Sequence, residues 1–135
     1  MIESEHLLIS TAFLKAGRNV IAIQFTAGNL SLNRNDEYVY TLLVPDRART
    51  VFPCFDQPDL KASFHLSLTV PAHWQAMANA PRLDSTIAGS RKTINFQPSA
   101  VIPTYLFSFV AGKFTAVSRT MQGRPMTLLH RETDT

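Results

Sequence analysis

Four histidines, one cysteine and a few carboxylates are the side chains of this sequence that could do chemistry. The histidines stand at positions 6, 65, 73 and 130, and no two are one helical turn apart, the spacing at which two imidazoles bind one zinc ion. His130 and Glu132 would lie on one side of a strand, but a catalytic zinc needs three protein ligands. The residues alone therefore predict no metal site.

Covalent catalysis and phosphate binding are not indicated either. Cys54 is the only cysteine and has no histidine near it in the sequence, so we expect a small buried hydrophobe rather than a reactive thiol. No serine stands in a G-x-S-x-G turn, and the five glycines are too isolated to make a phosphate-binding loop. These motifs favour a binding or supporting module over an enzyme.

Composition limits the class of protein. The 135 residues are 45% hydrophobic and 17% charged, which is typical of one globular domain. The net charge of +3 comes from scattered lysines and arginines, so we expect no nucleic-acid partner. The sequence contains neither a signal peptide nor an apolar run long enough for a membrane span. We expect a soluble chain without a membrane partner, and its localisation stays open.

Most of the sequence alternates between apolar and polar residues, which predicts β-strands. The expected strands cover residues 7–9, 20–25, 38–44, 63–70, 94–96, 105–111 and 126–130. Residues 114–118 either continue the strand before them or pair back as a hairpin. Short helical turns are expected near residues 46–50 and from Asp59. We predict one all-β domain over residues 1–135, mostly antiparallel and either saddle-shaped or sandwich-like.

The segment from Arg47 to Phe64 has the most unusual composition. Pro53 and Pro58 each fix a backbone angle, and Asp56 lies between them where it can accept hydrogen bonds from backbone N–H groups. Arg49 is close enough in sequence to reach that carboxylate. The pattern predicts a rigid loop that positions whatever packs on it.

This segment resembles a stretch of the aminopeptidase N family of zinc metallopeptidases, which includes leukotriene hydrolase. The family pattern is A-R-x-x-F-P-C-F-D-E-P-x-x-K-A-x-F. The matching residues are Ala48, Arg49, Phe52, Pro53, Cys54, Phe55, Asp56, Pro58, Lys61, Ala62 and Phe64, while Gln57 replaces the usual Glu. Residues 14–21, 79–81 and 103–114 resemble further family segments, so the resemblance covers residues 7–130.

The resemblance implies a non-catalytic N-terminal β-domain that packs on the catalytic domain of its parent chain. It would help to wall the cleft in which the parent removes N-terminal residues from peptides. The family binds zinc in the catalytic domain through H-E-x-x-H and a further Glu, and a G-x-M-E-N segment binds the substrate amine. None of these motifs occurs here. We expect no catalytic, metal or cofactor residue in this chain, which would begin after the family's first strands and end before the catalytic domain.

One position departs from the family pattern. Val44 stands where many members have a Gln or Glu for the substrate amine, and neither Leu42 nor Leu43 can accept a hydrogen bond in its place. Either the parent enzyme binds the amine through its catalytic domain alone, or its substrate preference differs. An insertion before Phe52 would shift this alignment.

An alternative for the whole chain is a standalone β-sandwich that binds a carbohydrate or a protein. That function would require exposed aromatic side chains on one face. Trp74, Tyr38, Tyr40 and Tyr105 are the candidates, and they do not group in the sequence.

Overall fold

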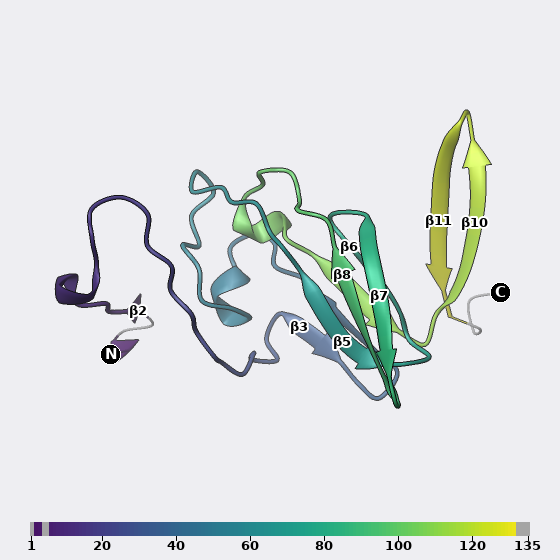
Figure 1. Cartoon of the computed structure of the whole chain (residues 1–135), viewed down its shortest axis with the longest axis horizontal. Helices are drawn as coiled ribbons and strands as arrows, with labels where there is room; N and C mark the ends of the chain where they lie inside the picture. Colours follow the sequence, from purple (N-terminus) through teal and green to yellow (C-terminus); the bar gives the residue numbers. More distant parts are fainter. Residues whose placement is uncertain (1, 4–5, 132–135) are drawn as a thin grey trace.

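The computed structural model of the chain describes residues 2–3 and 6–131 (Figure 1). Strands make up most of its regular structure, with three short 3-10 helices between them. The strands are β1 (Ile2–Glu3), β2 (His6–Leu7), β3 (Leu32–Arg34), β4 (Tyr38–Thr41), β5 (Ser67–Pro71), β6 (Gln75–Ala78), β7 (Arg82–Ala88), β8 (Arg91–Phe96), β9 (Phe109–Gly112), β10 (Thr115–Met121) and β11 (Arg124–His130). The helices are η1 (Thr11–Phe13), η2 (Ala48–Thr50) and η3 (Thr104–Leu106).

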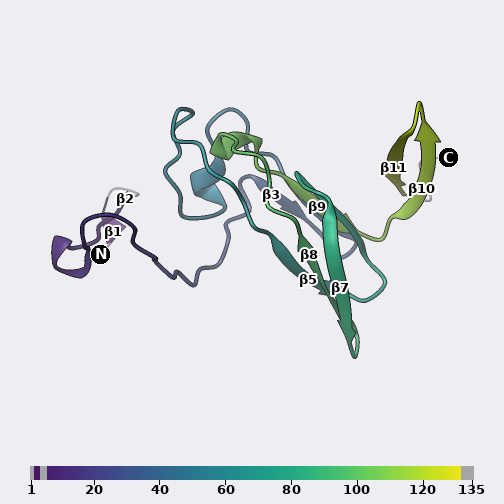
Figure 2. The same cartoon turned by 45° about the horizontal axis from the view of Figure 1, so that its top comes forward.

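Two antiparallel sheets form the body of the molecule. One has the strand order β3-β4-β9-β6 and the other the order β5-β8-β7 (Figures 1 and 2). In the first sheet β4 pairs with β9 in a register that sets Tyr38 opposite Gly112. The prediction of an all-β, mostly antiparallel, sandwich-like fold with short helical turns is confirmed.

The two sheets bury a shared core between them. Val70, Ile94 and Phe96 contribute from the second sheet, and Ala111 comes from β9 of the first. Trp74 is buried among them, just before β6. These residues alternate with polar ones along β5 and β8, so each strand has one buried and one exposed face.

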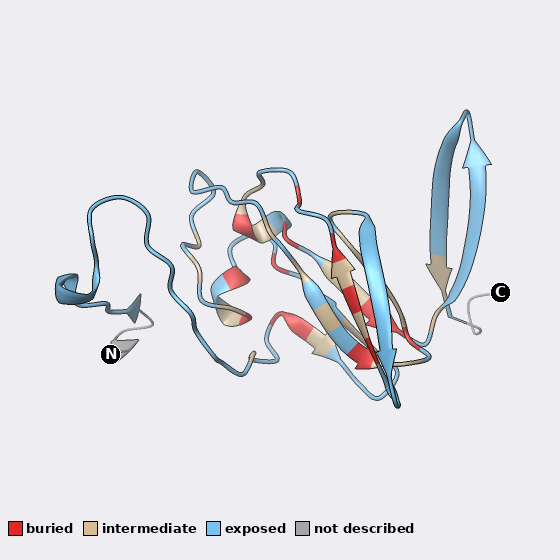
Figure 3. Cartoon of the chain, in the orientation of Figure 1, coloured by how far each residue is buried: buried red, intermediate tan, exposed pale blue. Residues whose placement is uncertain are grey.

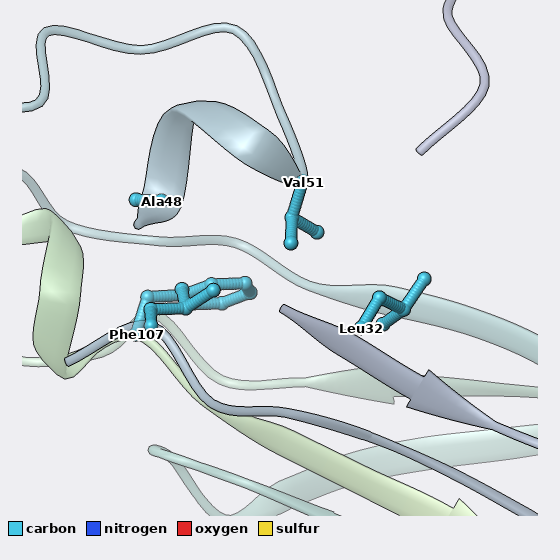
Figure 4. Packing of buried hydrophobic residues seen from close by; sticks show 5 residues of the cluster. Leu32, Ala48, Val51 and Phe107 are labelled. Atoms are coloured by element: carbon cyan, nitrogen blue, oxygen red, sulfur yellow. The ribbon is translucent and has the colours of Figure 1, made fainter. Parts of the chain in front are cut away.

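A second core lies at one end of the sandwich, beneath η2. Leu32, Leu43, Ala48, Val51 and Phe107 form its buried centre, and Figure 4 shows the Phe107 ring pointing into this cluster. The rings of Phe64 and Phe107 stack with centroids 4.5 Å apart, and Phe52 meets Phe107 edge-on at 5.4 Å. The segment from Arg47 to Phe64 therefore packs on a core to which the first sheet also contributes.

Strand boundaries differ from the predicted ones where pairing is irregular. The strand expected over residues 63–70 is regular only as β5, because the preceding residues meet residues 96–102 through scattered contacts such as the Ala62–Ile102 bridge. Pro71 ends that strand without disturbing it, since β5 is an edge strand and needs no donor there. The strand expected over residues 105–111 begins with η3 and becomes β9 only at Phe109.

The strand predicted over residues 20–25 is wrong. This segment belongs to an extended arm that leaves the body of the molecule, as Figure 1 shows at the left. Its apolar residues Val20, Ile21, Ile23 and Phe25 are exposed. Alternation alone does not make a strand, because a strand also needs a neighbour that takes up its backbone hydrogen bonds.

At the other end of the chain, β10 and β11 form a hairpin that stands apart from both sheets (Figures 1 and 2). Of the two possibilities for residues 114–118, the hairpin is therefore the observed one. Its turn contains Gln122 and Gly123, both with positive φ angles, which suit a tight two-residue turn. Within residues 2–3 and 6–131, no helix has the length and apolar character needed to cross a membrane.

Candidate functional site

The loop that follows η2 is organised around the Asp56 carboxylate. One of its oxygens accepts a hydrogen bond from the backbone N–H of Arg49 at 3.0 Å, and the other accepts one from the Thr104 hydroxyl at 2.8 Å. Asp56 thereby ties η2 to η3, two elements that are far apart in the sequence. The predicted rigid loop around Asp56 has a physical basis in these bonds.

Arg49 adds a weaker electrostatic contact to the same carboxylate. Its guanidinium Nη1 lies 3.5 Å from Asp56 Oδ2, and it also bonds to the backbone oxygen of Asp46. The Asp56 side chain is only 7% exposed, whereas that of Arg49 is 49% exposed. Solvent screens the ion pair at the arginine end, so the two shorter hydrogen bonds carry most of the anchoring.

An apolar groove of about 850 Å³ opens beside this loop. Its walls come from residues 25–32, 51–66 and 104–109. Phe52 and Cys54 are half-buried in it, while Pro53 and Lys61 line it from exposed positions. Pro58 is exposed outside that lining. Many of the family-like residues thus line this groove, and they form no catalytic constellation.

Cys54 sits in this groove as a free thiol. Burial, and to a smaller extent the Asp56 carboxylate, raise the pKa of the Cys54 thiol from 9.0 to about 11, and Arg49 opposes the shift. The expectation of an unreactive thiol agrees with this direction, because only the thiolate is a good nucleophile.

We expect Cys54 to react slowly with iodoacetamide in the folded chain. At pH 8 a pKa of about 11 leaves roughly 100-fold less thiolate than an unperturbed thiol has, and the greater nucleophilicity of a basic thiolate recovers about tenfold. The folded chain should therefore label roughly tenfold more slowly than the urea-unfolded chain, measured by mass spectrometry. Equal rates would contradict this.

The same shift predicts how Cys54 affects stability as the pH changes. The folded state prefers the protonated thiol, so the protonated Cys54 makes its full contribution to the free energy of unfolding below the pKa of the unfolded thiol. This contribution is lost as the pH rises from about 9 towards about 11.

Val44 lies at the surface, next to a cis peptide bond to Pro45. It is 54% exposed, and Leu42 is also exposed, while Leu43 between them is buried in the core under η2. Two exposed apolar side chains therefore stand at the position where many family members have a Gln or Glu. Neither can accept a hydrogen bond.

The described residues contain no group of three His, Cys, Asp or Glu side chains that could hold a metal ion. His130 stands at the end of β11, with Nδ1 3.1 Å from the backbone oxygen of Arg131. Glu132, its suggested partner, lies outside the described residues. The described part of the chain thus offers no donor set that fits a zinc ion.

The aromatic residues considered for a carbohydrate or protein site do not share one exposed face. Trp74 is buried between the sheets. Tyr38 and Tyr40 are neighbours on β4, with ring centroids 5.9 Å apart, and Tyr105 lies on η3. No specific observation favours the standalone binding module.

Thr104 and Phe107 lie in the family-like segment 103–114, but the sequence did not predict that they contact the Asp56 loop. Thr104 is 48 positions from the carboxylate that it contacts. Neither residue is unusual in its local sequence. The pairing of β9 into the first sheet and the Ala62–Ile102 bridge bring them to the loop.

Known proteins resemble this chain over the same region. The family model described as the peptidase M1 N-terminal domain matches residues 20–106. Aminopeptidase M1-D of Oryza sativa subsp. japonica is 45% identical over 67 residues, which cover 50% of this chain and 8% of that protein. Glutamyl aminopeptidase of Rattus norvegicus is 37% identical over 86 residues, covering 62% of this chain and 9% of the relative.

A third relative matches over a longer stretch. Aminopeptidase Q of Mus musculus is 36% identical over 101 residues, which cover 71% of this chain and 18% of the relative. The chain thus spans between 8% and 18% of the length of these three relatives. The region that the family model matches includes the Asp56 loop, the β5-β8-β7 sheet and three strands of the other sheet, β3, β4 and β6.

Proposed function

Since the chain belongs to the peptidase M1 N-terminal domain family, we propose that it is the non-catalytic N-terminal domain of a zinc-dependent aminopeptidase. In that role it packs on the catalytic domain of its parent chain and helps to wall the cleft that receives peptide substrates. Zinc and the catalytic residues belong to the catalytic domain.

The Asp56 anchor is the observation that carries this proposal. The carboxylate holds η2 and η3 together through the Arg49 N–H and the Thr104 hydroxyl. Such a clamp fixes the end of the sandwich as a rigid surface, and rigidity is what a cleft wall requires. The family-like residues of this region, Arg49, Phe52, Pro53, Cys54, Asp56, Pro58 and Lys61, have a structural role and take no part in catalysis.

The surface around Val44 bears on how the parent enzyme binds the amine of its substrate. Leu42 and Val44 present apolar side chains and no acceptor for a substrate amine. The parent enzyme therefore binds that amine through carboxylates of its catalytic domain, and this domain supplies only apolar contact.

Purified alone, the 135-residue chain should neither hydrolyse aminoacyl 7-amido-4-methylcoumarin substrates nor retain zinc. We expect less than about 0.1 zinc per chain after dialysis, because the described residues provide no set of three ligands. Fluorescence assays and elemental analysis would measure the two properties. Stoichiometric zinc with peptidase activity would overturn the non-catalytic role.

A second test addresses the parent protein. The gene downstream of the Thr135 codon should encode H-E-x-x-H, with a further Glu beyond it. If instead a stop codon follows directly, the chain has no catalytic domain of its own and the proposal fails.

A further inference from the structure

One face of the β5-β8-β7 sheet is buried on two strands and open on the third. Phe96, Ile94 and Lys92 point inward from β8 and are buried. Residues directly opposite each other in a ladder share a face, and these three pair with Arg82, Ser85 and Ile87 of β7. All of β7 is exposed, as the pale blue strand beside β8 shows in Figure 3. The first sheet therefore covers β5 and β8 and stops short of β7.

Lys92 is a charged residue in this largely apolar buried face. It is only 8% exposed, beside a core of apolar side chains, and its aliphatic stem can fill that space. Desolvation, and to a smaller extent the charge of Arg82, lower the pKa of the Lys92 ammonium group. Within residues 2–3 and 6–131, neither side chain makes a hydrogen bond or an ion pair.

Two unpaired cations thus lie on a face that also exposes apolar surface. Ile87, directly opposite Lys92, is 67% exposed. The carboxylate nearest in the ladder, Asp84, pairs with Asn95, whose side chain points to the opposite face and donates to Asp84 Oδ1 at 2.7 Å. The inward face of β7 therefore has positive charge, apolar area and no compensating anion.

We propose that the inward face of β7, formed by Arg82, Ser85 and Ile87 with Lys92 behind them, docks an extended polypeptide segment in which acidic and apolar side chains stand two positions apart. The segment's apolar residues cover Ile87, and one of its carboxylates lies between Arg82 and Lys92. An acidic partner gains because it supplies the counter-charge that the domain lacks, whereas a basic or neutral one leaves both cations uncompensated.

A polypeptide fits this face better than a free anion does. A small anion would neutralise the cations and leave Ile87 in water. A segment with an acidic and an apolar side chain two positions apart satisfies both requirements, since such side chains lie on one side of an extended chain. β7 is also the outer strand of its sheet, so nothing in the sheet lies beyond it.

Isothermal titration of the 135-residue chain with the peptide acetyl-Glu-Ser-Leu-Ser-Glu-amide, whose Glu and Leu side chains share one face when extended, tests this proposal. The matched control peptide carries Gln in place of each Glu. We expect the acidic peptide to bind, and the Gln peptide to bind at least about tenfold more weakly. Methyl NMR should place the largest shifts at Ile87.

Variants of the domain distinguish binding at this face from general charge attraction to the whole domain. Lys92→Met keeps the buried stem and removes the charge, and Arg82→Gln changes only an exposed side chain, so it retains the fold. Each should weaken binding of the acidic peptide by about tenfold. Arg91→Gln, on the opposite face of β8, should change it by less than about twofold. Equal affinity in all variants, equal affinity for both peptides, or no binding at about 1 mM peptide would overturn the proposal.

Discussion

Replacing Phe107 with alanine should lower the free energy of unfolding by about 3–5 kcal/mol. The ring is buried under η2, where it stacks on Phe64 at 4.5 Å and meets Phe52 at 5.4 Å. Its removal leaves a cavity beside the apolar groove and takes away both aromatic contacts. Urea unfolding monitored through the fluorescence of Trp74, which is buried in the other core, would measure the loss.

Phe55→Ala is the matched control for this substitution. Phe55 lines the same groove but is 80% exposed, so its removal should change stability by less than about 0.5 kcal/mol. If both variants lost the same stability, the aromatic cluster would not be the core of this end of the sandwich.

The second large effect is expected for Asp56→Ala, with a loss of about 2–3 kcal/mol. The substitution removes the acceptor of the Arg49 N–H and of the Thr104 hydroxyl, and Thr104 is itself buried. A buried donor left without a partner costs more than the bond contributed. Thermal unfolding followed by circular dichroism would report the change as a lower melting temperature.

Two variants show which interaction is responsible. Asp59→Ala removes an exposed carboxylate three positions further along and should leave stability unchanged within about 0.5 kcal/mol. Thr104→Val removes one donor and keeps the side-chain shape, so its cost should be about half that of Asp56→Ala. An unchanged melting temperature for Asp56→Ala would mean that the loop is not an anchor.

Local sequence predicted some of the elements whose neighbours are also local, although β3 and β7, which pair with the adjacent strands β4 and β8, were not predicted. The η2 turn, β8 and the last strand β11 were predicted from alternating apolar residues and from turn residues. β8 and β11 each pair with the strand that precedes them in the chain. β6, with the sequence Gln-Ala-Met-Ala, was not predicted because its residues have weak strand propensity. Pairing with β9 fixes it instead.

The Asp56 loop was predictable for the same local reason. Pro53, Asp56 and Pro58 lie within six residues, so their effect on the backbone can be inferred from the sequence. The Thr104 hydroxyl and the Phe107 ring depend on the β9 register and carry no local signal. The strand prediction for residues 20–25 failed for the opposite reason: their local alternation is strong, but no described strand pairs with them.

The pairing of β4 with β9 also determines when this fold can form during synthesis. β4 cannot pair with β9 until Gly112, the partner of Tyr38, has been made, and among the described strands β6 pairs with β9 alone. Both β4 and β6 therefore stay incomplete while the intervening chain is made. The β7-β8 hairpin closes over only a few residues and can form early, whereas the β4-β9 ladder carries the loop-closure cost of the whole segment. A ribosome that stalls before residue 109 would therefore expose two unpaired strand edges, the kind of surface on which nascent chains aggregate.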